Sequence, residues 1–236
     1  MTCDHASNRV PRALSRLGLD DGVLAQHIGW DIGAAAVTRH LATRLGASAV
    51  LAGYSRLVID CNRDPDDPSS IPAVSDDVAI PGNRGLADDE RHARQTAIFE
   101  PYHRAVARLI DAAMVRHIVP ALISVHSFTP SLGGQVRPWH VGILWDGDGR
   151  IPTPLLAALR DDAALMVGDN EPYSAREPAG YTVRHHALEH GLPHVAIEIR
   201  QDEIADAAGA TAWAERLAAA LEPILAMDSL YRLWQK

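Results

Sequence analysis

The sequence predicts an α/β fold, with a largely parallel sheet covered by helices on both faces. Short apolar runs rich in β-branched residues recur along the chain, and segments with helical apolar spacing lie between them. Strands that alternate with helices form parallel sheets whose crossovers cover both faces. Ligands bind such sheets at the carboxyl ends of the strands, so polar residues that follow a strand are candidates for function.

Four segments have the apolar spacing of amphipathic helices, at residues 31–45, 88–115, 152–161 and 207–225. In the first, Val37, Leu41 and Leu45 fall on one face. Pro101 should kink or split the second helix and Pro223 should interrupt the last, because proline lacks the backbone N–H and its ring clashes with the preceding turn.

Strands are predicted for the apolar runs at residues 48–55, 57–60, 121–125, 141–145, 165–167 and 195–199. Residues 64–85 are crowded with Pro, Asp, Ser and Gly, so we expect a loop without regular structure there. His5 lies so near the start that a strand before it either has very few residues or begins in upstream residues.

Length and composition favour one globular domain spanning residues 1–236 and a cytoplasmic location. Hydrophobic residues make up 47% of the chain and charged residues 22%, an ordinary globular balance. No run approaches the roughly 20 apolar residues of a membrane span, and no signal peptide is visible. A net charge of −8 without a basic tract argues against a nucleic-acid partner. The chain has neither a Walker loop nor a Gly-x-Gly-x-x-Gly stretch, so no nucleotide cofactor is indicated.

Two histidines are candidates for the site. His126 comes directly after the strand predicted at residues 121–125, so its imidazole should emerge at the carboxyl end of a buried strand. His5 adjoins the short first strand. Imidazole nitrogens bind metal ions, but a single histidine in such a place is also commonly a hydrogen-bonded structural residue, and both interpretations stay open.

The stretch from Arg56 to Arg63 combines cations with a carboxylate around a predicted strand. Alternation would place Arg56, Val58 and Asp60 on one face, with Arg63 past the end. A guanidinium binds a carboxylate through two parallel hydrogen bonds, so Arg63 is a candidate anchor for an acidic substrate, with Asp60 as its orienting partner. The alternative is an Asp60–Arg63 ion pair that only holds a loop.

Glu198 interrupts the apolar run 195–199, where burying a carboxylate without a partner is costly. Desolvation raises the pKa of a carboxyl group, as a general base for water and later an acid for the leaving amine requires near neutral pH. The alternative is a glutamate that faces outward from an edge strand.

These motifs together resemble the N-formylglutamate amidohydrolase family over nearly the whole chain. The resemblance rests on Asp4-His5-Ala6-Ser7, Trp30-Asp31, the Ser-Arg-x-x-x-Asp-x-Asn-Arg stretch 55–63, His126-Ser127, Asn170-Glu171-Pro172-Tyr173, Gly180-Tyr181-Thr182 and Glu198. More distantly, the order His, Asp-x-Asn-Arg, His, Glu is similar to that of zinc carboxypeptidases and aspartoacylase-like deacylases. The resemblance implies their three-layer αβα fold with a mixed, mostly parallel sheet, of the phosphorylase/hydrolase-like type.

The resemblance also implies a site. His5 and His126 would be metal ligands, with Asp31 the carboxylate that completes the set around Zn²⁺ or another divalent ion. The carboxypeptidase pattern would instead put an acidic ligand where this chain has Asn8. Arg56 would polarise the scissile carbonyl and Glu198 would transfer protons. Substrate-binding roles fall to Asn62, Arg63, Arg137 and Tyr181.

The expected activity is therefore metal-dependent hydrolysis of N-formyl-L-glutamate, or of a related acidic N-acyl amino acid, to formate and the amino acid, a reaction that the resemblance places in histidine degradation. Zinc with three N and O ligands keeps an open position for water, whose pKa falls to about 7 on the metal. Two alternatives remain: a deacylase or carboxypeptidase of other N-acyl amino acids, and a metal-free binding protein of the same fold.

Overall fold

The computed structural model describes residues 1–176 and 180–234. Its main feature is a six-stranded sheet with the order β2-β1-β5-β10-β8-β9. The strands are β1 (Thr2–Cys3), β2 (Val50–Leu51), β5 (Leu122–Phe128), β8 (Val141–Leu144), β9 (Val167–Asp169) and β10 (His194–Arg200). Two small hairpins lie outside it, formed by β3 (Val74–Ser75) with β4 (Val78–Ala79) and by β6 (Ser131–Leu132) with β7 (Gln135–Val136).

Most of the sheet is parallel. The strands β2, β1, β5 and β10 run in one direction, whereas β8 is antiparallel to β10 and β9 is parallel to β8. This confirms the predicted α/β class with a mixed, mostly parallel sheet. The strand β10 lies inside the sheet, so Glu198 is not on an edge strand as one alternative supposed.

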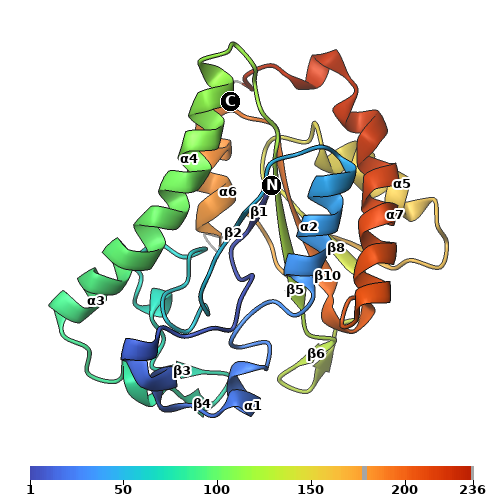
Figure 1. Ribbon diagram of the computed structural model, residues 1–236. Coiled ribbons are helices and arrows are strands. Elements are labelled where there is room, and N and C mark those ends of the chain that lie inside the picture. Colours follow the sequence, from blue (N-terminus) through green and yellow to red (C-terminus); the bar gives the residue numbers. More distant parts are fainter. Residues whose placement is uncertain (177–179, 235–236) are drawn as a thin grey trace.

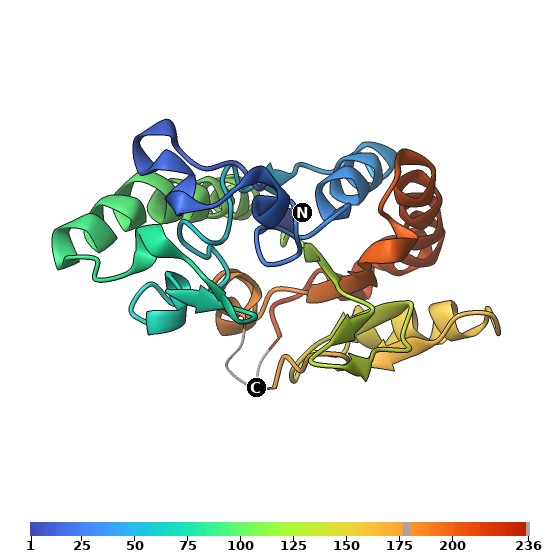
Figure 2. The same ribbon diagram turned by 90° about the horizontal axis from the view of Figure 1, so that it is seen from below.

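Helices cover both faces of the sheet, as Figures 1 and 2 show. One face carries α2 (Ala34–Arg44), α5 (Pro152–Arg160) and α7 (Ala207–Leu225), and the other carries α4 (Glu100–Met114) and α6 (Tyr181–His186). Two further helices, α1 (Asp21–Leu24) and α3 (Asp88–Arg94), lie towards the lower end of Figure 1, where the carboxyl ends of β1 and β5 also lie.

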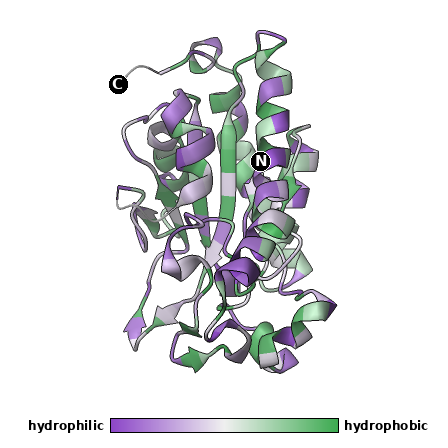
Figure 3. Ribbon diagram, turned by 90° about the vertical axis from the view of Figure 1, so that its left-hand side faces the viewer, coloured by the Kyte–Doolittle hydropathy of each residue, from purple (hydrophilic) through white to green (hydrophobic). Residues whose placement is uncertain are grey.

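The two faces of the central strands differ in polarity. On β10, Val195, Ile197 and Ile199 belong to the large apolar core under α2, α5 and α7. Because side chains alternate along a strand, Glu198 and the other even-numbered residues point to the α4 and α6 face. Figure 3 shows the hydrophobic colour concentrated in the middle of the sheet and mixed colours along the helices. The polar site therefore belongs to the α6 side of the sheet.

Two of the predicted strands do not form as expected. The run at 48–55 contributes only Val50–Leu51 to the sheet, and the strand predicted at 57–60 is wrong, because these residues form consecutive turns. Two of their carbonyls accept hydrogen bonds from side chains instead of a neighbouring strand: the amide nitrogen of Asn83 donates to the Leu57 carbonyl and Arg94 donates to the Val58 carbonyl. The apolar residues of the run are buried in two small clusters outside the main core, Leu57 and Val58 in one and Ile59 in the other.

The predicted helices are confirmed, with different interruptions. The segment 88–115 is divided by a π-helical stretch, Gln95–Phe99, directly before Pro101, where the ring would meet the preceding turn. The helix α7 passes Pro223 and ends at Leu225. Residues 64–85 are mostly irregular apart from the β3–β4 hairpin and two short 3-10 turns. Among the helices of the described residues, none combines the length and apolar character that crossing a bilayer would take.

Replacing Gly142 tests how closely the segment at 170–173 packs on the sheet. A Cβ atom at Gly142 would overlap the Glu171 carbonyl oxygen, so Gly142→Ala should lower the free energy of unfolding by about 1–3 kcal/mol in urea denaturation. Gly53→Ala is the control, because its Cβ would meet only the Arg9 guanidinium at 3.9 Å. Equal stability of the two variants would contradict this account.

Candidate metal centre and substrate cavity

Three side chains from distant segments meet at the carboxyl end of the parallel strands. Oδ2 of Asp31 lies 3.1 Å from Nδ1 of His5 and 2.8 Å from Nδ1 of His126. His5 follows β1, Asp31 precedes α2, and His126 lies inside β5, which runs three residues further than the prediction. All three are buried, and their potential ligand atoms lie within 4.8 Å of one another. The predicted ligand set is thus brought together in one place.

A second layer of carboxylates holds the two imidazoles from behind. Nε2 of His5 lies 2.7 Å from Oδ1 of Asp60, and Nε2 of His126 lies 3.0 Å from Oδ2 of Asp4. Metal-binding histidines in proteins typically donate their other ring N–H to a carboxylate, which fixes the tautomer and the ring orientation. The donor set therefore fits a divalent cation, which both Nδ1 atoms and Asp31 would hold.

In this cluster, the attraction between the imidazoles and the carboxylates shifts their pKa values more than burial does. Burial alone would lower the pKa of His126, but Asp31 and Asp4 raise it well above its ordinary value. Burial alone would raise the pKa of Asp31, but His5 and His126 hold it well below its usual range. The buried carboxylates are thus balanced by protonated imidazoles when no cation is bound, and a metal ion would displace those protons.

Asp4 connects His126 to two helices, a role that was not assigned to it from the sequence. Its Oδ1 accepts hydrogen bonds from the Tyr102 hydroxyl at 2.6 Å and the Thr182 hydroxyl at 2.7 Å, and its Oδ2 accepts one from Ser124. Asp4 and Thr182 stand in motifs that carried the family resemblance, but neither was assigned a role there, and Tyr102 left no signal. Their roles arise from contacts across about 100 and 180 residues.

Asp60 has different partners from those expected. Its Oδ2 accepts two hydrogen bonds from Arg56, at 3.0 and 2.7 Å, while its Oδ1 takes the His5 contact and the backbone N–H of Asn62. Burial acts to lower the pKa of Arg56, but the neighbouring carboxylates of Asp60 and Asp31 raise it above its ordinary value. The expected pairing of Asp60 with Arg63 is thus replaced by an ion pair with Arg56, in which two guanidinium N–H groups share one oxygen and which the turns of residues 55–60 bring within reach.

Glu198 lies beside the cluster on the next strand. It stands directly opposite His126 in the parallel pairing of β10 with β5, and it is only 8% exposed. Its Oε2 is buried and has no hydrogen-bond partner among the described residues. Burial raises the pKa of Glu198 to about 7. Such a carboxyl group exchanges a proton near neutral pH, as general acid–base catalysis requires.

A cavity of about 210 Å³ contains these groups. Its walls include the whole His5, Asp31 and His126 cluster together with Glu198, Arg56, Asn62 and Arg63. The side-chain oxygen of Asn62 also accepts the backbone N–H of Thr182 at 3.0 Å, which ties the start of α6 to the cavity wall.

Two predicted substrate-binding residues lie further out. Arg137 reaches the cavity only through Tyr173: it donates to the Tyr173 hydroxyl at 2.9 Å, and its guanidinium lies 4.8 Å from the centre of that ring. Tyr173 itself lines the cavity. The Tyr181 ring packs edge-on against Phe99 and stacks on His185, and it is not among the groups that line the cavity in the described residues.

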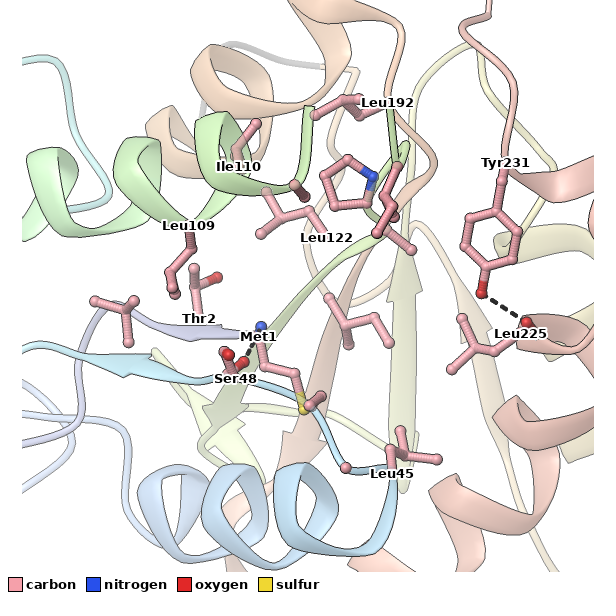
Figure 4. A pocket seen from close by; sticks show the side chains of 18 of the residues that line it. Met1, Thr2, Leu45, Ser48, Leu109, Ile110, Leu122, Leu192, Leu225 and Tyr231 are labelled. Atoms are coloured by element: carbon pink, nitrogen blue, oxygen red, sulfur yellow. Dashed lines mark hydrogen bonds between the residues drawn. The ribbon is translucent and has the colours of Figure 1, made fainter. Parts of the chain in front are cut away.

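A larger cavity, of about 850 Å³, lies around the amino end of β5, away from the cluster. Figure 4 shows it surrounded by apolar side chains, among them Leu45, Leu109, Ile110 and Leu122. If size alone decided, this cavity would be the candidate for the catalytic site. The smaller one holds the imidazoles, the carboxylates and the arginines, so it is the candidate for catalysis.

The fold and this site define an α/β protein with the polar constellation of an amidohydrolase. The chain belongs to the N-formylglutamate amidohydrolase family, whose sequence model matches residues 1–205.

Relatives agree with this membership. An N-formylglutamate deformylase of Pseudomonas aeruginosa is 28% identical over 201 residues, which cover 78% of this chain and 74% of the relative. One of Pseudomonas putida is 29% identical over 158 residues, or 60% of this chain and 58% of that relative.

Two solved structures share the fold. A gene product of Agrobacterium tumefaciens matches with a TM-score of 0.91 and 39% sequence identity, and the match covers 95% of this chain and 88% of that chain. An N-formylglutamate amidohydrolase of Ralstonia eutropha JMP134 matches with a TM-score of 0.65 and 18% sequence identity, and the match covers 95% of this chain and 92% of that chain. At this identity, the likeness supports the fold alone.

Substituting Thr182 tests the contact behind His126. Thr182→Val keeps the buried shape but removes a hydrogen bond to Asp4, so it should cost about 1–3 kcal/mol of unfolding free energy and weaken zinc binding about tenfold. Thr182→Ser keeps the hydroxyl and should restore both values. Urea denaturation and competitive zinc titration measure them, and zinc affinity that is the same in all three proteins would exclude the positioning role.

The buried Glu198 predicts a pH-dependent stability difference in metal-free protein. The folded state holds the Glu198 proton up to a pKa of about 7, whereas the unfolded chain releases it near the ordinary value, so this group destabilises the fold as pH rises between the two. Glu198→Gln lacks this effect. Its unfolding free energy relative to wild type should rise by about 2–3 kcal/mol from pH 5 to pH 8. A difference that is constant across this range would refute the raised pKa.

Proposed function

We propose that this protein is a metal-dependent amidohydrolase that releases formate from N-formyl-L-glutamate or a closely related N-acyl amino acid. The observation that carries the proposal is the buried cluster of His5, Asp31 and His126, with the protonatable Glu198 beside it in one cavity. The names of the Pseudomonas relatives support the formyl amide as the bond that is cleaved.

The metal would be held by Nδ1 of His5, Nδ1 of His126 and Oδ2 of Asp31. When bound there, a divalent cation such as Zn²⁺ polarises the amide carbonyl and makes water acidic enough to attack near neutral pH. The mixed nitrogen and oxygen donors suit zinc, although the same set accepts other divalent ions.

Glu198 would carry the protons. As a carboxylate it takes a proton from the attacking water, and as a carboxylic acid it returns one to the leaving nitrogen, which departs as a neutral amine. Its place opposite His126 in the strand pairing supports this role, because it puts the carboxyl group beside the cluster and away from bulk solvent. A pKa near 7 makes both protonation states accessible.

The cationic part of the cavity would bind the amino acid. Asn62 and Arg63 line the wall and are proposed to hold the substrate carboxylate. Arg56 keeps its charge beside Asp60 and Asp31 and is proposed to stabilise negative charge on the scissile carbonyl. Arg137 would act by orienting Tyr173.

Tyr181 would act through the packing of α6. Its backbone N–H donates to the Asn62 carbonyl at 3.0 Å, and its ring lies between Phe99 and His185. This placement supports an indirect part in substrate binding, in which Tyr181 keeps Asn62 in position.

Formate release tests the proposal directly. Zinc-supplemented wild type should release formate from N-formyl-L-glutamate, and Glu198→Gln should lower kcat by about 10²–10⁴-fold because the proton carrier is lost. Glu215→Gln, an exposed change on α7, is the matched control and should keep full activity.

Metal removal gives a second readout of the same proposal. Chelation should abolish formate release and zinc should restore it, and elemental analysis should find close to one equivalent of metal in the active protein. An active Glu198→Gln protein, or activity that survives complete metal removal, would overturn the mechanism.

A further inference from the structure

Asn62, which is proposed to hold the substrate carboxylate together with Arg63, stands in a tight turn. The backbone N–H of Arg63 donates to the Asp60 carbonyl at 3.2 Å, so Cys61 and Asn62 are the two central residues. The two common forms of such a turn differ by a rotation of the central peptide group, and the second form requires a positive φ at the third residue. Here that residue is Asn62, which keeps a negative φ. Asparagine also tolerates a positive φ, so the local sequence is compatible with both forms.

Two hydrogen bonds hold the central peptide group of this turn, one from each side. The N–H of Asn62 donates to Oδ1 of Asp60 at 2.8 Å. The Cys61 carbonyl accepts a hydrogen bond from Nε2 of His103 at 2.9 Å, and this nitrogen must carry the hydrogen because a carbonyl only accepts. The Thr182 hydroxyl lies further from the same carbonyl, at 3.4 Å, and its hydrogen already goes to a carboxylate. Rotating the peptide group would break both bonds, so His103 favours the form that the structure shows.

His186 sets the tautomer of His103. Nδ1 of His103 lies 2.9 Å from Nε2 of His186, and both rings are buried on the neighbouring helices α4 and α6 (Figure 1). Burial lowers the pKa of each ring to about 4, so both rings are neutral at pH 7 and each has one N–H group. Since His103 carries its hydrogen on Nε2, its Nδ1 accepts and Nε2 of His186 donates. The two hydrogen bonds therefore run in one direction, from α6 through α4 to the turn.

Aromatic packing leaves the His103 ring little freedom to turn. Three ring centres surround it, at 4.2 Å for Phe99, 5.1 Å for Tyr102 and 4.9 Å for Tyr181. A ring in such a close-packed place cannot leave the Cys61 carbonyl unless its neighbours move. His103 is thus a rigid donor, although it has no contact with the metal centre among the described residues.

The form of the turn decides where the Asn62 side chain points. The backbone N–H of Thr182 donates to Oδ1 of Asn62, and that of Tyr181 donates to the Asn62 carbonyl, both at 3.0 Å. With Oδ1 engaged in this way, the Nδ2 group is the part of the side chain that can donate to a substrate carboxylate. A rotated central peptide would give Asn62 a positive φ and redirect this side chain.

We propose that His103 is a positioning residue for substrate binding. Oriented by His186, it holds the Cys61–Asn62 peptide group so that the Asn62 amide stays directed at the substrate carboxylate. The inference rests on the proposed function for the identity of the substrate. The metal centre does not depend on His103, because the Asp60 carboxylate is also held by two hydrogen bonds from Arg56. Loss of His103 should therefore weaken substrate binding and leave zinc binding and the chemical step close to unchanged.

Steady-state kinetics of the zinc-supplemented enzyme separates positioning from catalysis. His103→Phe keeps a ring and removes the donor, so KM for N-formyl-L-glutamate should rise about tenfold while kcat stays within about twofold of wild type. His103→Gln has an amide that can donate from nearly the place of Nε2, so it should restore most of the wild-type KM. The matched control is His40→Phe, an exposed change on α2, which should behave as wild type does.

Two results of these measurements would overturn the inference. One is an unchanged KM in His103→Phe, and the other is a fall in kcat at unchanged KM. Competitive zinc titration is the accompanying measurement, and it should give the same zinc affinity for His103→Phe and wild type.

Replacing His186 tests whether the two rings act through one bond. His186→Phe removes the group that orients His103, so it should raise KM by less than His103→Phe does. The double variant should have the same KM as His103→Phe, because His186 has no effect once the donor to the turn is lost. Effects on KM that multiply in the double variant would contradict this arrangement.

Nitrogen-15 NMR of wild type tests the arrangement without any assay of activity, and so serves even if a variant does not fold. At pH 7 both His103 and His186 should be neutral, with the hydrogen on Nε2. A charged His103 ring, or a hydrogen on its Nδ1 alone, would overturn the inference.

The two proposals fail in different ways. Calorimetry with zinc-supplemented Glu198→Gln measures binding of N-formyl-L-glutamate without turnover. If wild type releases no formate but His103→Phe weakens this binding about tenfold, the hydrolysis is wrong and the positioning role stands. If wild type releases formate and His103→Phe keeps the wild-type KM, the hydrolysis stands and the positioning role is wrong. A protein that neither binds nor hydrolyses the compound would contradict both.

Discussion

The site depends on one buried oxygen atom that two imidazoles share. Oδ2 of Asp31 faces Nδ1 of both His5 and His126, and all three groups are buried. A carboxylate in such a place must be balanced by positive charge, either protons on the rings or a cation that replaces them. The balance is strict, because removing any member leaves an uncompensated buried charge.

The groups behind the imidazoles extend the same constraint to the rest of the fold. Asp60 supports His5 and is held by Arg56, while Asp4 supports His126 and is held by side chains from α4 and α6. Each ring is thereby fixed in orientation before any ligand arrives. The wall that faces the substrate is part of the same network, since α6 also bonds to Asn62. Metal binding and the shape of the substrate cavity are therefore physically linked.

The location of the site follows from an asymmetry between the two faces of the sheet. Under α2, α5 and α7, Ile123 and Val125 of β5 and the odd-numbered residues of β10 belong to a continuous apolar core, which supplies most of the hydrophobic stabilisation. The opposite face can then carry Ser124, His126 and Glu198 in the middle of the sheet, because their polar atoms lie against other polar groups or the cavity. The short side chain at Ala196 continues this face as open space.

The sequence by itself determined the elements whose apolar periodicity is strong and local, such as β5, β10 and α7, and it singled out His5, His126 and Glu198 because polar residues beside apolar runs are informative on a short scale. It assigned a strand to residues 57–60, where the apolar pattern reflects burial in a turn. Only the tertiary structure decided which carboxylate serves which imidazole and that Asp4 takes part, since these pairings join residues 26 to 178 positions apart. Such contacts leave no periodic signal in the chain, because they are set by the packing of helices onto the sheet.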